Sequence, residues 1–241
     1  MKKQFFDYHF FKSLENTNDE IKKINLIRGK NNNLALFSKI QSKGRGRSSK
    51  KWISHKGDLT CSFLINKELE IKEVGRVNLI VAISIIEIFK NIGLKEEINF
   101  KWPNDIFIRK KKIAGVLIET NILKNKIQNL TIGIGVNFIS KSIDGKYPPI
   151  SISNLKLRID PINFFFMISN NLSLYFNDYE RLDFQKLSLV LSRYFLYSKR
   201  LVKIKKAGNH IQGNFVRINS YGKLILKNNS EKYEINYGEL L

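Results

Sequence analysis

Residues 101–120, KWPNDIFIRKKKIAGVLIET, place side chains that can do chemistry close together in the chain. A Trp-Pro-Asn-Asp corner precedes two apolar runs, 106–108 and 113–119, and four consecutive cations at 109–112 separate these runs. Short apolar runs joined by a few polar residues predict a β-hairpin, here with a basic tip. Lysines at such edges and tips are commonly solvated, so most of these cations need no further role.

Lys112 is the cation that we single out. It comes directly before the second strand of this hairpin, and that strand contains Gly115. A missing side chain in a strand often marks the close approach of a ligand or of another backbone. Asn104 and Asp105 open the first strand. The hairpin therefore combines a cation, a carboxylate and an uncharged amide, which together could form part of a binding or catalytic site.

A second candidate is the loop at 41–52, QSKGRGRSSKKW, in which two glycines alternate with two arginines. Glycine permits motion and arginine favours contact with anions, although a solvated surface loop is an alternative interpretation. Residues 39–51 include six cations and no acid. Apolar runs at 34–40 and 59–65 predict strands on both sides, so both ends of the loop should be anchored.

Two further groups of polar residues lie at the ends of predicted elements. Thr17-Asn18-Asp19-Glu20 fits the Ser/Thr-x-x-Glu capping box ahead of isoleucines at helical spacing, so Thr17 is predicted to cap a helix. The nearly uniform apolar stretch 130–138 predicts a strand buried on both faces, with Asn137 near its end. A buried amide needs hydrogen-bond partners, either in the core or in a ligand at the end of the strand.

The remaining pattern predicts a body of helices and strands followed by a small β unit. The elements predicted in the body are a strand at 4–11, helices at 74–92, 160–180 and 184–196, and a loop at 147–155. From Leu201 the period shortens to β-like runs separated by Gly and Asn, at 201–206, 214–218, 223–227 and 232–236. This many short strands in about 45 residues indicates a small barrel.

The composition is that of a globular chain. Of 241 residues, 43% are hydrophobic and only 4 are proline, which provides enough apolar surface to offset the entropy lost on ordering. A net charge of +21 would suit binding to nucleic acid or to an anionic membrane. However, the cations are spread over the whole chain, which is also rich in Asn, Ile and Phe, so drift in composition is the favoured explanation.

Cysteine usage and hydropathy indicate the compartment. Cys61 is the only cysteine, which excludes an intramolecular disulfide and fits a reducing environment. Asp7, His9 and Lys12 interrupt the apolar start of the chain, so no secretion signal is predicted. The longest uncharged apolar run, 77–86, is about half of the roughly 20 residues that span a membrane. We expect a cytoplasmic protein that does not enter membranes.

Together, these motifs resemble those of the biotin protein ligases, and the resemblance extends over nearly the whole chain. The residues that carry it are Thr17-Asn18, Gln41, Gly44-Arg45-Gly46-Arg47, Trp52, Lys101-Trp102-Pro103-Asn104-Asp105, Lys112, Gly115, Gly133-Ile134-Gly135-Val136-Asn137 and Gly238-Glu239. Each motif alone is weak, but their combination is specific. The chain departs from the family pattern at Asn16, where Ser is usual, and at Ser49 and Lys50, which replace Gly-Arg.

The resemblance implies an α+β fold. Residues 1–196 would form the catalytic domain, a mixed β-sheet flanked by helices like that of class II aminoacyl-tRNA synthetases, and residues 197–241 would form a small C-terminal SH3-like β-barrel. It also implies an ATP-dependent biotin protein ligase. The biotin carboxylate would attack the α-phosphorus of ATP, with Mg²⁺ bound to the nucleotide, to give biotinyl-AMP and pyrophosphate. A lysine of a biotin carboxyl carrier domain, from acetyl-CoA carboxylase or a related carboxylase, would then take the biotinyl group. A monomer or weak homodimer is expected.

The resemblance also implies roles for individual residues. Lys112, Arg45, Arg47 and Asp105 would be catalytic, with the cations stabilising charge on the phosphate and Asp105 orienting Lys112 or the incoming amine. The residues implied to bind biotin are Asn16, Thr17, Asn18, Gln41, Arg45, Gly46, Arg47, Lys112 and Gly115. Those implied to bind ATP are Arg45, Arg47, Trp52, Asn104, Lys112 and Asn137. No residue is assigned to hold a metal ion directly.

Two alternatives remain open. Lipoate ligases and octanoyltransferases share the sheet architecture, but their usual Arg-Arg-x-x-Gly-Gly-Gly and His-Asp signatures are absent from this sequence. A basic nucleic-acid-binding protein is the alternative from another class. Some biotin ligases carry an N-terminal helix-turn-helix domain; fifteen residues precede Asn16 here, so we expect the monofunctional type without sequence-specific DNA binding. Any affinity for DNA should then fall steeply with salt.

Overall fold

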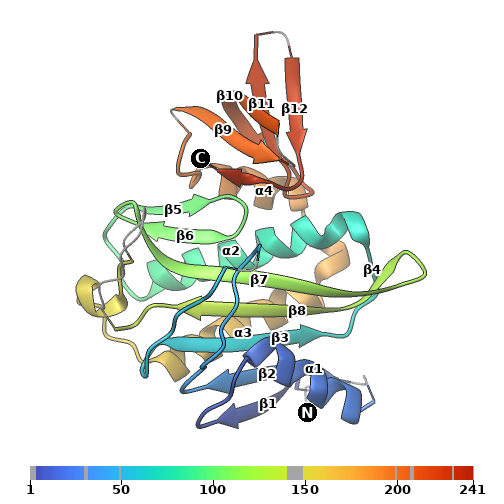
Figure 1. Ribbon diagram of the computed structural model, residues 1–241, viewed down its shortest axis with the longest axis vertical. Coiled ribbons are helices and arrows are strands. Elements are labelled where there is room, and N and C mark those ends of the chain that lie inside the picture. The colour runs from blue at the N-terminus through green and yellow to red at the C-terminus, as the bar shows by residue number, and fades with distance from the viewer. Residues whose placement is uncertain are drawn as a thin grey trace.

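The computed structural model describes residues 4–29, 32–48, 50–139, 149–198, 200–206, 209–229 and 231–240. The strands form two sheets, of eight and five strands, that follow each other along the chain. Figure 1 shows the smaller sheet standing beyond one edge of the larger one. The first two residues of the predicted loop 147–155 lie outside the described residues.

The larger sheet is mixed, as predicted. Its strands are β1 (Phe6–Phe11), β2 (Asn33–Ser38), β3 (Leu59–Ile65), β4 (Leu69–Glu70), β5 (Ile98–Lys101), β6 (Asp105–Ile108), β7 (Lys111–Leu123) and β8 (Lys126–Val136). They lie in the order β1-β2-β3-β8-β7-β6-β5, with the short β4 paired to β8. β1 and β2 are parallel, whereas the other neighbours are antiparallel. The predicted basic hairpin is formed by β6 and β7.

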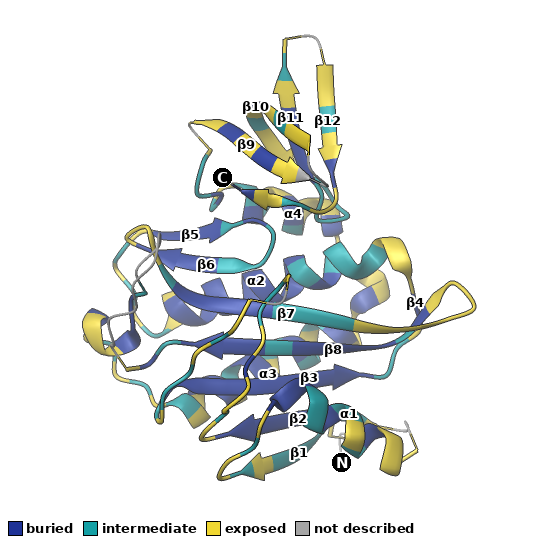
Figure 2. Cartoon of the chain, in the orientation of Figure 1, coloured by how far each residue is buried: buried dark blue, intermediate teal, exposed yellow. Residues whose placement is uncertain are grey.

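Helices cover both faces of this sheet. They are α1 (Thr17–Ile27), α2 (Val74–Asn91), α3 (Pro161–Asn177) and α4 (Phe184–Ser192), with short 3-10 turns at Ile71–Glu73, Ile152–Leu155 and Tyr179–Arg181. In Figure 1, α2 and α3 lie behind the sheet and α1 lies in front of it. Figure 2 shows that β3 and most of β8 are buried, so the core lies between these strands and the α2–α3 layer. None of the described helices combines the length and apolarity needed to cross a membrane.

The helix predicted at 184–196 ends earlier than expected, at Ser192. Beyond it the chain forms turns, and Phe195 makes an isolated parallel bridge to Phe100 at the outer edge of β5. The Phe100 N–H donates to the Tyr194 carbonyl at 2.6 Å, and the Leu196 N–H donates to the Phe100 carbonyl at 2.9 Å. An unpaired sheet edge is a liability, and pairing it with the chain takes precedence over the helical pattern.

The smaller sheet is antiparallel throughout. Its strands are β9 (Leu201–Lys206), β10 (Asn209–Ile218), β11 (Leu224–Asn228), β12 (Glu231–Ile235) and β13 (Glu239–Leu240), in the order β12-β11-β10-β9-β13. The strands predicted from the change of period are present, and the last, β13, was not predicted. A second, C-terminal sheet agrees with the expected small domain, while its closure into an SH3-like barrel and the exact boundary at residue 196 stay predictions.

A tight joint fixes the smaller sheet to the larger body. The turn between β10 and β11 lies against the first turn of α2, where a Cβ atom at Gly75 would be 1.9 Å from the Tyr221 carbonyl oxygen. Trp102 Nε1 donates to the Gly222 carbonyl at 2.9 Å. The Arg76 guanidinium lies 4.4 Å from the centre of the Tyr221 ring. Because Trp102 belongs to the KWPND corner, this joint connects the C-terminal sheet to that corner.

Replacing Gly75 by alanine should therefore destabilise the protein. The added methyl group must push Tyr221 away, and overpacking of this kind costs about 1–3 kcal/mol. Urea unfolding of the wild type and the variant measures the difference. The sign of the change in the free energy of unfolding is informative by itself, because replacing glycine by alanine within a helix normally stabilises a protein by roughly 0.5–1 kcal/mol. A more stable Gly75→Ala variant would contradict the tight joint.

Candidate active site

The register of the sheet places small and polar residues side by side on the face that α1 covers. Asp105 of β6 lies opposite Gly115 of β7, Gly115 lies opposite Gly135 of β8, and Gly135 lies opposite Thr60 of β3. Residues that are directly opposite in neighbouring strands point to the same face. Two adjacent glycines in this row leave space above the sheet, and this space forms the floor of the candidate site.

Two side chains lie directly on this glycine floor. A Cβ atom at Gly115 would be 2.9 Å from the Trp52 ring, and one at Gly135 would be 2.3 Å from it. A Cβ atom at Gly133 would be 2.5 Å from Asn18 Oδ1. Contacts this short would force a rearrangement, so the three glycines are needed where Trp52 and Asn18 pack. The strand glycines thus mark a close approach, as the sequence indicated for Gly115.

The loop between β2 and β3 crosses the floor and encloses a cavity of about 740 Å³, a volume in the range of small-molecule sites. In Figure 1 this loop runs in front of β8 and β7. All candidate site residues except Asn137 line the cavity, namely Asn16, Thr17, Asn18, Gln41, Arg45, Gly46, Arg47, Trp52, Asn104, Asp105, Lys112 and Gly115. Residues from four separate segments of the chain therefore converge on one space.

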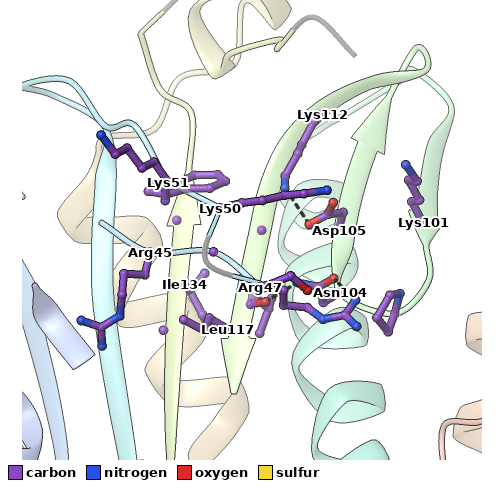
Figure 3. A pocket seen from close by; sticks show the side chains of 18 of the residues that line it. Arg45, Arg47, Lys50, Lys51, Lys101, Asn104, Asp105, Lys112, Leu117 and Ile134 are labelled. Atoms are coloured by element: carbon purple, nitrogen blue, oxygen red, sulfur yellow. Dashed lines mark hydrogen bonds and ion pairs between the residues drawn. The ribbon is translucent and has the colours of Figure 1, made fainter. Parts of the chain in front are cut away.

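Lys112 and Asp105 form an ion pair in the cavity wall, with 2.7 Å between Lys112 Nζ and Asp105 Oδ1 (Figure 3). Lys112 Nζ also lies 5.2 Å from the centre of the Trp52 ring, within cation–π range. The two charged side chains are 29% and 21% exposed, so the pair is accessible from the cavity. Residues 109–111 at the hairpin tip are exposed and do not line it. Lys112 thus differs from its three neighbours as predicted.

Asn104 fixes the KWPND corner against β7. Its Nδ2 atom donates to the Val116 carbonyl at 2.5 Å, and the Val116 N–H donates to the Asn104 carbonyl at 3.0 Å. Its Oδ1 atom accepts a hydrogen bond from Arg47 Nη1 at 3.3 Å. The amide therefore holds both the corner and an arginine of the glycine-rich loop in place.

The N-terminus of α1 contributes uncharged polar groups, and its cap corrects a prediction. The capping residue is Asn16 instead of Thr17, because Asn16 Oδ1 accepts from the backbone N–H groups of Asn18 at 2.9 Å and Asp19 at 3.2 Å. Thr17 is consequently free to bind Gln41, whose Oε1 accepts from the Thr17 N–H at 2.8 Å and from its hydroxyl at 3.1 Å. One end of the cavity is thus lined by neutral donors and acceptors.

The two arginines of the GRGR motif differ in their surroundings. Arg47 connects the loop to the KWPND corner and to the turn before β13, since its Nη1 binds Asn104 and its Nη2 donates to the Gly238 carbonyl at 3.3 Å. Burial lowers the pKa of Arg47, against the opposing effect of two nearby carboxylates, but a guanidinium remains charged. Arg45 binds Asp19 and is directed away from the Lys112–Asp105 pair in Figure 3.

The C-terminal sheet supplies cavity residues that were given no role from the sequence. The lining residues from this sheet and the turn before β13 are Lys205, Tyr237, Gly238, Glu239 and Leu240. Glu239 forms an ion pair with Lys50 of the glycine-rich loop, and the hydrogen bond from Lys50 lowers the pKa of the Glu239 carboxyl. Gly238-Glu239 carried part of the family resemblance, but nothing in the local pattern placed it beside residue 50.

Asn137 does not line the cavity among the described residues. Its Nδ2 atom donates to the carbonyls of Lys112 at 3.2 Å and Ile150 at 3.3 Å, and its backbone N–H donates to the Ile113 carbonyl at 2.9 Å. This side chain thus links the end of β8 to the start of β7 and to the following segment. Contact between Asn137 and ATP stays a prediction.

The comparison with known proteins agrees with this geometry. The sequence profile of the biotin/lipoate A/B protein ligase family matches residues 10–137. The bifunctional ligase/repressor BirA of Bacillus spizizenii is 32% identical over 106 residues, which cover 43% of this chain and 32% of BirA. The biotin--[acetyl-CoA-carboxylase] ligase of Paracoccus denitrificans is 24% identical over 144 residues, covering 57% and 59%. The chain thus spans from about a third to three fifths of these relatives' lengths.

A solved structure extends the similarity over the whole chain. The biotin protein ligase from Aquifex aeolicus in complex with biotin and ATP superposes with a TM-score of 0.81 at 26% identity, and the match covers 98% of this chain and 97% of that one. The similarity includes the C-terminal sheet as well as the eight-stranded sheet. From the profile match and this superposition, we conclude that the chain belongs to the biotin/lipoate A/B protein ligase family.

Proposed function

We propose that this protein is an ATP-dependent biotin protein ligase. The observation that carries the proposal is the single cavity that joins a neutral polar end, at Thr17 and Gln41, to a cationic wall that includes Arg47 and Lys112. Biotin has an uncharged ureido ring at one end and a carboxylate at the other, and ATP brings its phosphates to that carboxylate. The cavity offers each of these groups a complementary environment.

In the first step, an oxygen of the biotin carboxylate would attack the α-phosphorus of ATP, and pyrophosphate would leave. Negative charge builds on the phosphate oxygens in this reaction, and fixed cations stabilise it. Lys112 is suited to this role because Asp105 and the Trp52 ring hold its ammonium group at the cavity wall. Arg47, which is bonded to Asn104 next to Asp105, would add a second positive charge.

Mg²⁺ would accompany ATP, and the acidic residues of the site fit a metal carried by the nucleotide. Asp105 and Glu239 are the two carboxylates that line the cavity, and the described residues contain no cluster of three or more metal-binding side chains. Mg²⁺ bound to nucleotides commonly takes one or two protein carboxylates together with phosphate oxygens and water. Asp105 and Glu239 would supply these oxygens, and the bound ion would neutralise charge on the phosphates.

In the second step, the amine of a carrier lysine would attack the acyl carbon of biotinyl-AMP, form an amide and release AMP. The mixed anhydride is sensitive to water, so the loop over the cavity would protect it until the carrier arrives. The carrier we propose is a biotin carboxyl carrier domain of a carboxylase, in line with the name of the Paracoccus relative. Cys61, the only cysteine and fully buried, suits a reducing compartment such as the cytoplasm.

An incorporation assay tests this proposal. Purified protein, labelled biotin, ATP and a carrier domain should give a biotinylated carrier and biotin-dependent release of pyrophosphate. A carrier whose acceptor lysine is replaced by arginine serves as the control and should remain unlabelled. Transfer of lipoate or octanoate with no transfer of biotin would instead support the related acyltransferase activity, which the relatives' names do not favour.

A further inference from the structure

Arg45 lies in the glycine-rich loop but its guanidinium makes a fork-to-fork contact outside the centre of the cavity. Nη1 donates to Asp19 Oδ2 at 2.5 Å and Nη2 donates to Asp19 Oδ1 at 2.6 Å. Nη2 also lies 3.5 Å from Glu119 Oε1. Two parallel bonds between a guanidinium and a carboxylate fix both direction and distance, which makes this contact more specific than a single lysine pair.

The carboxylates that receive Arg45 belong to rigid elements. Asp19 lies in the first turn of α1 and Glu119 lies in β7. Glu119 Oε2 accepts from Asn18 Nδ2 and from Lys22 Nζ, each at 2.8 Å. Although burial opposes it, these bonds lower the pKa of Glu119, and the hydrogen bond from Arg45 lowers the pKa of Asp19. Glu119 is therefore held in place and in its charged form by partners other than Arg45, whereas the lowered pKa of Asp19 is a consequence of the contact with Arg45.

Arg47, two residues further along the loop, is fixed on the other side. It binds Asn104 and the Gly238 carbonyl, as described above. Arg45 and Arg47 thus connect the loop to opposite walls of the cavity. The backbone at Gly46, between them, is held within the loop, because the Gly46 N–H donates to the Lys50 carbonyl at 2.7 Å. A guanidinium that is bound to α1 and β7 is directed away from the Lys112–Asp105 pair and is therefore poorly placed to reach a phosphate there.

We propose that Asp19 and Glu119 are positioning residues that hold Arg45, and that Arg45 anchors the glycine-rich loop to α1 and β7 instead of contacting the phosphate. The phosphate is left to Arg47 and Lys112. This inference rests on the proposed function for its kinetic consequences, but the anchoring itself is a property of the protein without substrates.

An exchange of charges tests the anchor. The single variants Asp19→Arg and Arg45→Asp should each lose the pair, and the double variant should regain it with the two charges exchanged. All of them are made and compared in a Glu119→Gln background, because a carboxylate at position 45 would otherwise be repelled by Glu119. Hydrogen exchange of the Gly46 and Trp52 amides, which bond to Lys50 and Gly44 inside the loop, reports how firmly the loop is held. We expect each single change to raise exchange at both amides by on the order of tenfold, and the double variant to recover most of this loss.

The kinetic readout separates an anchor from a phosphate ligand. If Arg45 is an anchor, the double variant should also recover biotin-dependent pyrophosphate release. If Arg45 instead binds the phosphate, the double variant should stay slow, because the aspartate at position 45 cannot replace a positively charged phosphate ligand. Recovery of amide protection without recovery of pyrophosphate release would overturn the inference. So would unchanged exchange in both single variants. A wild-type protein that releases no pyrophosphate with biotin would refute the proposed function, while the exchange measurements would still decide the anchor.

Conservative variants guard against loss of folding. Asp19→Asn keeps the shape of the side chain and removes its charge, and the helix cap is untouched because Asn16 provides it. Exchange in the loop should rise with this variant too. Glu20→Gln is the matched control in the next helical position. Among the described residues its carboxylate pairs with the exposed Lys23 at 3.4 Å, and this change should leave the loop unchanged. If both variants raised amide exchange in the loop equally, the cause would be the loss of any negative charge from the first turn of α1, which would contradict the anchor.

Discussion

Replacing Lys112 by alanine should slow the formation of biotinyl-AMP by on the order of 10²- to 10³-fold, the range found when a preorganised donor to a developing oxyanion is removed. The physical reason is its placement. The ammonium group lies 2.7 Å from Asp105 and 3.2 Å from where a Cβ atom of residue 115 would be, above the glycine floor. Biotin-dependent pyrophosphate release measures this step without the carrier.

The fold should survive this change, because the Lys112 side chain contacts the cavity wall and does not belong to the core. Thermal unfolding of the variant checks this. Lys110→Ala is the matched control: it removes the same charge from the exposed tip of the same hairpin, and its rate should stay within about twofold of wild type, as for a screened surface charge. Equal losses in the two variants would leave only the general basicity of the hairpin as an explanation.

The sequence located most of the site because its polar groups occur in short, recognisable stretches. The GRGR loop, the KWPND corner and the strand glycines each have a local pattern, and the register of antiparallel strands then brings Asp105, Gly115 and Gly135 into one row. The alternation of a strand fixes which residues share a face, so the contents of the floor follow once the pairing is known.

Elements without a strong period were missed or misjudged. β5 has four residues and no alternation that distinguishes it from a loop. The prediction ended β7 at residue 119, but the strand continues to Leu123 because its exposed end pairs with β8 across a turn at Lys124 and Asn125. The β-propensity of the residues does not predict these strands, since cross-strand pairing determines the structure of such polar segments.

Contacts between distant parts of the chain could not be read from local patterns. Lys50 and Glu239 are 189 positions apart, and their pairing depends on how the C-terminal sheet docks. The charged partners of Arg45 were also missed, because Asp19 was assigned to a helix cap and Glu119 to the end of a strand. The GRGR motif therefore predicted the loop, but only the docked structure distinguishes the surroundings of its two arginines.

Replacing Arg47 by glycine should slow the formation of biotinyl-AMP, because one of the two positive charges assigned to the phosphate is lost, and it should impair retention of biotinyl-AMP still more. Arg47 joins the glycine-rich loop to Asn104 and to the Gly238 carbonyl, so its removal takes away two of the contacts that hold the loop over the cavity, while Lys112 and Asp105 remain in place. An opened loop would release the reactive adenylate into solution, where it can acylate lysines on unrelated proteins. Labelled biotin on a bystander protein such as serum albumin, together with free adenylate seen by chromatography, measures this release.

Lys43→Gly is the matched control for the loop. It introduces the same residue and removes the same charge, but Lys43 lies outside the cavity and pairs with the exposed Glu15 at 2.7 Å. Its labelling of bystanders should equal that of the wild type. If Arg47→Gly is instead inactive with no free adenylate, then Arg47 is needed for the chemical step itself, and closure of the loop must depend on the remaining contacts, those of Arg45 with Asp19 and of Lys50 with Glu239.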